Sequence, residues 1–265
     1  MWKNKKLIYD KQGQLPTPFV KDSYILIFYS WRKDGISHIG KLKFDYNFSL
    51  LDDDPYALLP GERGSFDDSG VMPSCIFENY LFYSGWHLRK SVPYSHAIGV
   101  CQINENEKLE RIYSGPVFST NKNAPCLVNS PFVYSEDNKT KMIYCAGTHW
   151  DQDKPCYHLR IATSSSNFNF IDDQEYFKTN CENDAISRCC IHDGISYFSI
   201  KKLNSNYEIF SINENKLIKP FIPKNELDQD MQCYPYLFQL NGRKEKYMLY
   251  NGNGYGSTGI FMLFN

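Results

Sequence analysis

One pattern of short apolar segments recurs five times along the 265-residue chain and constrains the fold more than any other feature. In each copy, an apolar segment that begins at or near a proline is followed by a turn, an aromatic-rich segment, a longer loop and a third apolar segment. Short strands at regular spacing, separated by turn residues, are typical of all-β folds. The sequence therefore predicts an all-β fold built from repeated units.

The five copies align by the order of their segments rather than by residue identity. The aromatic-rich segments are residues 24–31, 80–86, 141–147, 195–200 and 247–252. We interpret each copy as a four-stranded antiparallel blade and the chain, residues 1–265, as a single five-bladed β-propeller domain. The segment 6–9 is expected to cover the open edge of the last blade as its outer strand. A β-sandwich would also give short strands, but it does not explain the fivefold order.

The charge balance and the N-terminus exclude several partners. The chain has 29 Lys and Arg against 30 Asp and Glu, so no basic face is expected that could bind nucleic acid. The apolar residues near the N-terminus are too few for a signal segment or a membrane span. We therefore predict a cytoplasmic protein without a membrane partner, and the sequence does not indicate its oligomeric state.

The nine cysteines are predicted to be core residues rather than metal ligands. No two are spaced as Cys-x-x-Cys, and adjacent Cys189 and Cys190 would point to opposite faces of a strand. Four lie within apolar segments and are expected to be reduced and buried: Cys75, Cys101, Cys145 and Cys233. No metal and no cofactor are predicted.

Candidate catalytic carboxylates precede three of the five first strands. The innermost strands of a propeller start at one mouth of its channel, where Asp68, Glu182 and Asp230 are expected to converge. Carboxylates in an aromatic-lined concave site can act as acid and base on a glycosidic bond. The alternative is that each carboxylate caps a turn before its strand.

Candidate binding residues follow the second strands or lie at the starts of the first. Arg188 would pair with an anionic group, although an ion pair with Glu182 or Asp184 is an equal alternative. Trp and His at one topological position would surround the mouth as sugar-binding groups, although the tryptophans could instead pack between blades. The candidates are Arg32, His87, His149, Trp150, Arg188, Tyr234 and Asn251.

Several segments together resemble a known group of proteins. Residues 66–74, 83–86, 232–236 and 247–256 resemble the five-bladed propellers similar to glycoside hydrolase family 43. The resemblance is strongest to a bacterial branch found beside surface-polysaccharide genes, which implies a carbohydrate or nucleotide-sugar ligand. In the hydrolases of this group an Asp base, a positioning Asp and a Glu acid occupy the first three blades. Here Thr17 and Asn129 stand at the first and third positions, and only Asp68 corresponds.

Two functions follow from these observations. The first is an enzyme that acts on a glycosidic or sugar-phosphate linkage in cell-surface glycan biosynthesis, using Asp68, Glu182 and Asp230, with Arg188 holding an anionic group. The alternative is a catalytically inactive sugar-binding module that uses the same mouth. A third class, a protein-interaction propeller, would bind no sugar and would expose an apolar face.

Overall fold

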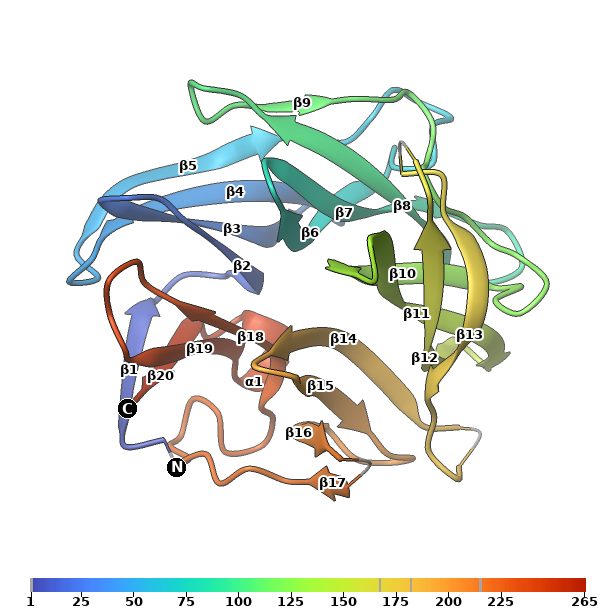
Figure 1. Ribbon diagram of the computed structural model, residues 1–265. Coiled ribbons are helices and arrows are strands. Elements are labelled where there is room, and N and C mark those ends of the chain that lie inside the picture. Colours follow the sequence, from blue (N-terminus) through green and yellow to red (C-terminus); the bar gives the residue numbers. More distant parts are fainter. Residues whose placement is uncertain (1, 167, 182, 215) are drawn as a thin grey trace.

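A computed structural model describes residues 2–166, 168–181, 183–214 and 216–265, and nearly all of its regular structure is β-strand (Figure 1). The single helix among these residues is the short α1 (Asn253–Gly256), and no helix there has the length and apolar character to cross a bilayer. The predicted all-β class is confirmed.

The strands form three hydrogen-bonded sheets in which all pairs are antiparallel except two. The first sheet holds β2 (Gln14–Val20), β3 (Tyr24–Lys33), β4 (Ile36–Asp45), β5 (Leu50–Leu58), β6 (Gly70–Phe77), β7 (Tyr80–Leu88), β8 (Tyr94–Ile103) and β9 (Leu109–Arg111). The second holds β10 (Leu127–Glu136), β11 (Lys139–Asp151), β12 (Lys154–Ser164), β13 (Ile171–Phe177), β14 (Ala185–His192), β15 (Ile195–Lys201), β16 (Tyr207–Asn213) and β17 (Lys216–Ile218). The third holds β18 (Cys233–Gln239), β19 (Lys246–Asn251), β20 (Ile260–Phe264) and β1 (Asn4–Tyr9).

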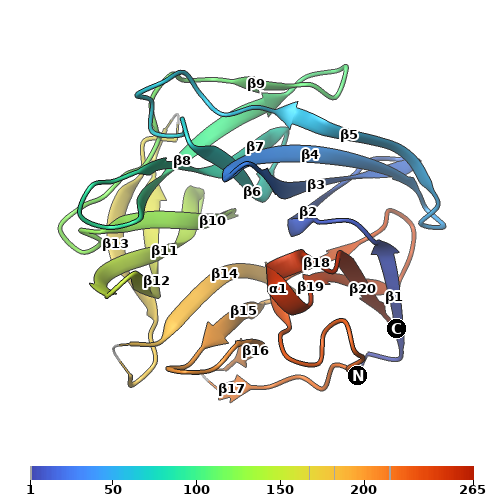
Figure 2. The same cartoon turned by 180° about the vertical axis from the view of Figure 1, so that it is seen from behind.

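The two larger sheets each divide into two antiparallel groups of four strands. A single parallel bridge joins the groups, Ser37 to Gly70 in one sheet and Tyr157 to Ala185 in the other. We name the groups unit 1 (β2–β5), unit 2 (β6–β9), unit 3 (β10–β13), unit 4 (β14–β17) and unit 5 (β18–β20 with β1). Their first strands β2, β6, β10, β14 and β18 each contact the next, and both views show them nearest the centre (Figures 1 and 2).

Apolar clusters fill the spaces between neighbouring units. Ile27 and Leu42 of unit 1 pack with Leu249 and Met262 of unit 5. The adjacent cysteines of β14 point to opposite faces as predicted, because Cys189 packs against unit 3 and Cys190 packs against unit 5. Seven of the nine cysteines are buried, including Cys75, Cys101, Cys145 and Cys233, which lie within the predicted apolar segments. The prediction that all nine are core residues is wrong for Cys181, which is exposed, and for Cys126, which is half-buried.

Every first strand carries an irregularity in its pairing with the second strand. In four units the first residue of this bulge has a positive φ: Leu15, Ser130, Arg188 and Tyr234. A β-bulge of this kind bends the strand and re-aims a side chain. Unit 2 has Pro73 in this position, and its ring excludes a positive φ. The bulge of unit 1 begins at Leu15-Pro16, so Pro16, and not Pro18 as the sequence pattern indicated, is the equivalent proline.

A buried tyrosine in the second strand of four units binds an aspartate. The hydroxyls of Tyr29, Tyr83, Tyr144 and Tyr250 donate to Asp53, Asp67, Asp172 and Asp228 over 3.0, 3.0, 2.6 and 2.8 Å. Each of these carboxylates also pairs with a cation, in order Lys11, Arg111, Arg160 and Lys5. Burial raises the pKa of all four tyrosines, so their hydroxyls remain hydrogen-bond donors. In unit 4 the equivalent residue is Phe198, which has no hydroxyl.

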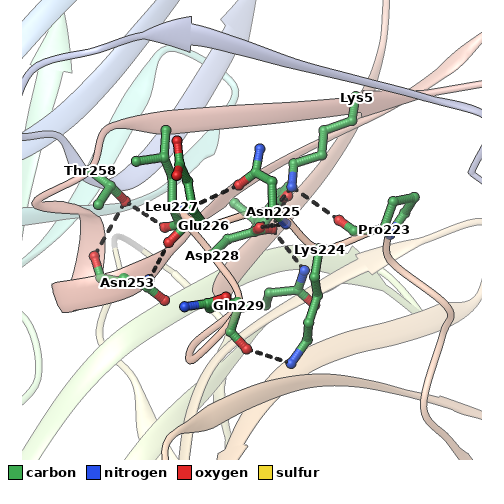
Figure 3. A network of polar contacts seen from close by, with 12 residues as sticks. Lys5, Pro223, Lys224, Asn225, Glu226, Leu227, Asp228, Gln229, Asn253 and Thr258 are labelled. Atoms are coloured by element: carbon green, nitrogen blue, oxygen red, sulfur yellow. Dashed lines mark hydrogen bonds and ion pairs between the residues drawn. The ribbon is translucent and has the colours of Figure 1, made fainter.

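The predicted closure by the N-terminal strand is confirmed, because β1 pairs antiparallel with β20. Lys5 of β1 donates to Asp228 over 2.8 Å and to the Pro223 carbonyl over 3.0 Å (Figure 3). Asp228 also accepts a bond from the Asn225 backbone N–H. Burial alone would raise the pKa of Asp228, but the hydrogen bonds that it accepts outweigh burial and lower the pKa. The pair therefore fixes the N-terminal strand to unit 5.

Replacing Asp228 with alanine is expected to lower the free energy of unfolding by about 3 to 5 kcal/mol. The reason is that Lys5 and the Tyr250 hydroxyl would lose a partner in a buried position. Urea unfolding measures the change. Lys11→Ala is the control, because the Lys11 side chain is 69% exposed and its pair with Asp53 should contribute little to the stability. Equal losses in both variants would contradict the structural role of the buried pair.

Candidate ligand-binding site

A cavity of about 440 Å³ lies where the first and third strands begin and the second strands end. We call it the central cavity, and all five units contribute to its wall. The residues that line it are Gln12, Gln14, Leu15, Arg32, Met72, Trp86, Tyr94, His96, Asn129, Ser130, Tyr157, Ser187, Tyr207, Tyr234 and Tyr255. Residues far apart in the sequence therefore meet in one concave site.

Tyrosine rings form much of one wall. Tyr234 stacks with Tyr255 at 6.5 Å between ring centroids and 30° between planes, and Tyr207 lies 6.0 Å from Tyr234 and 6.1 Å from Tyr255. Burial raises the pKa of Tyr157, Tyr207 and Tyr234 well above its usual value, so these phenols stay neutral. The wall offers flat apolar faces with hydroxyl groups at their edges.

A second cavity, of about 480 Å³, adjoins this wall between units 3 and 4, and we call it the side cavity. It shares five tyrosines with the central cavity: Tyr94, Tyr157, Tyr207, Tyr234 and Tyr255. Lys201 lines the side cavity and donates to the Tyr255 hydroxyl over 3.2 Å. The two cavities together form a continuous tyrosine-lined site that could hold more than one ring of a ligand.

A buried polar pair lines the central cavity on another side. The Asn129 amide lies 3.1 Å from His96 Nδ1, and the two residues are 7% and 8% exposed. Burial, with the positive charge of Arg32, lowers the pKa of His96 to about 3, so the ring is neutral. If Asn129 donates to Nδ1, the His96 proton is on Nε2. The Asn129 Oδ1 atom has no hydrogen-bond partner among the described residues and can accept one from a ligand.

Arg32 is the charged residue of the central cavity wall. Its guanidinium lies over the Trp86 ring at 5.3 Å, and the Trp86 indole N–H donates to Ser37 Oγ over 2.9 Å. The Arg32 backbone N–H donates to Gln12 Oε1 over 3.1 Å. In the described part of the chain, Arg32 forms no ion pair and no carboxylate lines the central cavity.

Two of the predicted binding residues, Arg32 and Tyr234, line the central cavity. Trp150 does not line the central cavity, but its ring lies edge-on to the lining residue Tyr94 at 5.2 Å between centroids. His149 lines a different cavity of about 310 Å³, which shares Tyr157 with the central one. His87 is outside the lining, with Nδ1 3.4 Å from the Phe66 carbonyl oxygen.

Asn251 holds backbone together rather than facing the cavity. Its Oδ1 accepts from the Leu15 N–H over 2.8 Å, and its Nδ2 donates to the carbonyls of Gly13 and Gly259 over 2.6 and 2.9 Å. The side chain is fully buried and does not line the central cavity. These bonds fix the bulge of unit 1 against the end of β19.

The structure does not bring Asp68 and Asp230 together in the central cavity. Asp68 accepts from the Gly64 N–H and the Ser69 hydroxyl, both over 2.9 Å, and so caps the turn before β6. Asp230 is exposed, and its backbone N–H donates to Asn253. Glu182 lies outside the described residues. The expected convergence of carboxylates is therefore not seen for the two that are described.

Arg188 is buried between the units and does not line the central cavity. Its Nη2 atom donates to the Pro16 carbonyl over 2.8 Å, to Thr17 Oγ1 over 2.7 Å and to the Ser74 carbonyl over 3.3 Å. The guanidinium lies 5.1 Å from the centre of the Tyr236 ring. Burial lowers its pKa to about 10, so it is charged at neutral pH. The proposed ion pair with Asp184 is not formed.

Replacing Arg188 with alanine is expected to lower the free energy of unfolding by about 3 kcal/mol or more. The change leaves a cavity and removes the donor from two carbonyls and a hydroxyl. Chemical unfolding measures it. Arg63→Ala, at an exposed position, should change the stability by no more than about 0.5 kcal/mol. An unchanged stability in Arg188→Ala would show that this contact does not hold the units together.

Several lining residues were not predicted: Tyr94, His96, Tyr157, Tyr207 and Tyr255. Three of them share one signal, since Tyr94, Tyr157 and Tyr207 lie at or near the start of a third strand. In an antiparallel unit the third strand begins at the same end as the first. A search of third-strand starts, in addition to first-strand starts, would have found these tyrosines.

The chain is similar to known proteins in sequence and in structure. No family model matches the chain. The chain is 29% identical over 271 aligned residues to the uncharacterized protein MT1551 of Mycobacterium tuberculosis, which covers 93% of this chain and 90% of that protein. Among solved structures, BT0996 in a complex with RGII superposes with a TM-score of 0.72 at 13% identity, covering 100% of this chain and 91% of that one.

Two further structures extend this comparison. A thermostable family-43 glycoside hydrolase has a TM-score of 0.65 at 10% identity and covers 96% of this chain and 88% of its own. A Bombyx mori GH32 β-fructofuranosidase mutant in complex with sucrose has a TM-score of 0.64 at 14% identity, covering 98% of this chain and 61% of that one. The resemblance to the propeller-type fold of these glycoside hydrolases is therefore confirmed at the level of fold.

Proposed function

We propose that this protein is a carbohydrate-binding β-propeller whose ligand occupies the central cavity and extends along the tyrosines of the side cavity. In this proposal, units 1 to 5 are the four-stranded blades of one five-bladed domain. The contacts between successive first strands and the antiparallel order within each unit support this description. The ligand site is then the mouth of the propeller.

The lining suits a sugar for two physical reasons. A pyranose has apolar faces that stack on aromatic rings, and the stacked Tyr234 and Tyr255 provide such a surface. Sugar hydroxyls also need donors and acceptors in fixed positions, which the neutral phenols, the His96 ring and the unpaired Asn129 Oδ1 provide. The combination of stacking faces with buried polar groups supports a carbohydrate over a purely apolar ligand.

One observation favours sugar binding over hydrolysis. Glycoside hydrolysis by acid and base uses two carboxyl groups about 5 to 9.5 Å apart across the scissile bond. The central cavity has no carboxylate among its described lining residues, and the buried aspartates Asp67 and Asp228 are bound to cations and tyrosines elsewhere. The geometry therefore supports the sugar-binding alternative best.

Tyr255→Ala is expected to weaken binding of the preferred glycan by about tenfold or more, because it removes one of two stacked rings. Isothermal titration across a panel of oligosaccharides and nucleotide sugars measures the affinity, and circular dichroism confirms that the variant is folded. Tyr56→Ala is the matched control, since Tyr56 is 47% exposed and lies in β5 away from the cavity. Equal affinity of wild type and Tyr255→Ala would contradict the proposed site.

The hydrolase hypothesis remains a prediction with its own test. It assigns Asp68, Glu182 and Asp230 as acid and base groups, and the fold shared with glycoside hydrolases supports it. Wild-type protein and the variants Asp68→Asn, Glu182→Gln and Asp230→Asn are incubated with the same panel, and released sugar is measured. Since the central cavity lacks described carboxylates, we expect no turnover by the wild type. Turnover that Glu182→Gln or Asp230→Asn abolishes while binding persists would contradict this expectation.

The sequence resemblance adds the biological context to the proposal. It implies an oligosaccharide or a nucleotide sugar as the ligand and a role in cell-surface glycan biosynthesis. A complete lack of glycan binding across the panel would instead favour the protein-interaction class.

A further inference from the structure

The charges around the central cavity are distributed unevenly. Arg32 lines the cavity, and within the described chain no carboxylate lines it and none pairs with Arg32. Three other cations near the core, Lys5, Arg111 and Arg160, are paired with aspartates. A cation in a concave site without a counter-charge attracts anions to that site, and Arg32 is such a cation although its side chain is exposed.

The orientation of Arg32 leaves its hydrogen-bonding groups available. The guanidinium centre lies 5.3 Å from the centroid of the Trp86 ring, and its N–H groups form no hydrogen bond with the described residues. Trp86 is held in place by its bond to Ser37, and the Arg32 backbone is held by Gln12. The planar Arg32 guanidinium can bind two oxygens of a carboxylate or a phosphate at once.

Two further cations add to the positive potential. Arg188 is fully buried beside the cavity residue Ser187 and has no carboxylate within ion-pair distance among the described residues. Lys201 binds the Tyr255 hydroxyl in the side cavity, which also contains Asp151 and Asp153 with Lys154 and Lys202. The tyrosines between Arg32 and Lys201 stay neutral because burial raises their pKa values, so they do not cancel this potential.

We infer that the ligand of the central cavity is an acidic carbohydrate and that Arg32 binds its carboxylate or phosphate group. This inference rests on the proposed function, since it names the class of sugar that the cavity takes. Arg32 is the specificity-determining residue, and Lys201 is placed to contact the part of the ligand that extends into the side cavity. The tyrosines and the pair of His96 and Asn129 bind the sugar itself.

The test compares acidic sugars with neutral partners of the same shape. The probes are glucuronate with its methyl ester, glucose 1-phosphate with glucose, and UDP-glucose, with the oligosaccharide panel used in parallel. Affinities are measured by titration calorimetry for wild type, Arg32→Gln and Lys33→Gln. Lys33 is the matched control because it is the next residue of β3, is exposed and does not line the central cavity.

We expect wild type to bind the acidic member of a matched pair about 10- to 100-fold more tightly than the neutral one, since a hydrogen bond to a charged group has about this strength. Arg32→Gln should remove the preference for the acidic member of a pair, whereas Lys33→Gln should retain it. Raising the salt concentration should weaken only the acidic probes. Whether the carboxylate or the phosphate probes show the preference identifies the anionic group.

Two results would overturn the inference. Only the second would also overturn the proposed function. Equal binding of acidic and neutral partners, unaffected by Arg32→Gln, would show that the site takes neutral sugars and would leave the proposed function intact. No binding of any probe or oligosaccharide by the folded wild type would overturn both the inference and the proposed function.

Discussion

The buried Arg188 guanidinium is the contact on which the arrangement of the units depends. It belongs to unit 4, donates to backbone or side-chain oxygens of units 1 and 2, and lies against Tyr236 of unit 5. The positive φ of Arg188 at the bulge of β14 directs the side chain to this position. Burying a charge without a carboxylate partner is costly, and the carbonyl oxygens and the aromatic ring offset that cost. The bulges of the first strands therefore shape the centre of the molecule and the cavity above it.

Four aspartates of this chain serve its architecture. Asp53, Asp67, Asp172 and Asp228 each bind a second-strand tyrosine and a cation, in four units of different sequence. These carboxylates come from β5, β13 and the loops before β6 and β18, and none of them lines the central cavity. A fold shared with glycoside hydrolases can thus hold a cavity that is lined by an arginine and by no described carboxylate. This separation of charges links the way the chain folds to the ligand that it is proposed to bind.

The sequence predicted much of the fold because the repeat is carried by apolar and aromatic residues that form the strands. The all-β class, the pairing of residues 6–9 with the last strand and the opposite faces of Cys189 and Cys190 follow from strand periodicity. The site was harder to predict, because strand periodicity does not fix where the side chain of a neighbouring loop residue points. Asp68 precedes β6 by two residues, yet its carboxylate turns back to Gly64. Arg32 and Tyr234 were found because each lies within a strand that ends or begins at the mouth.

A crystal structure of the protein with a bound acidic oligosaccharide would be the most direct test of the proposed site. We expect a sugar ring against Tyr234 and Tyr255, with its anionic group in contact with the Arg32 guanidinium. Density for the sugar in another part of the surface, for example beside Asp68 or Asp230 and with the central cavity empty, would contradict the proposal.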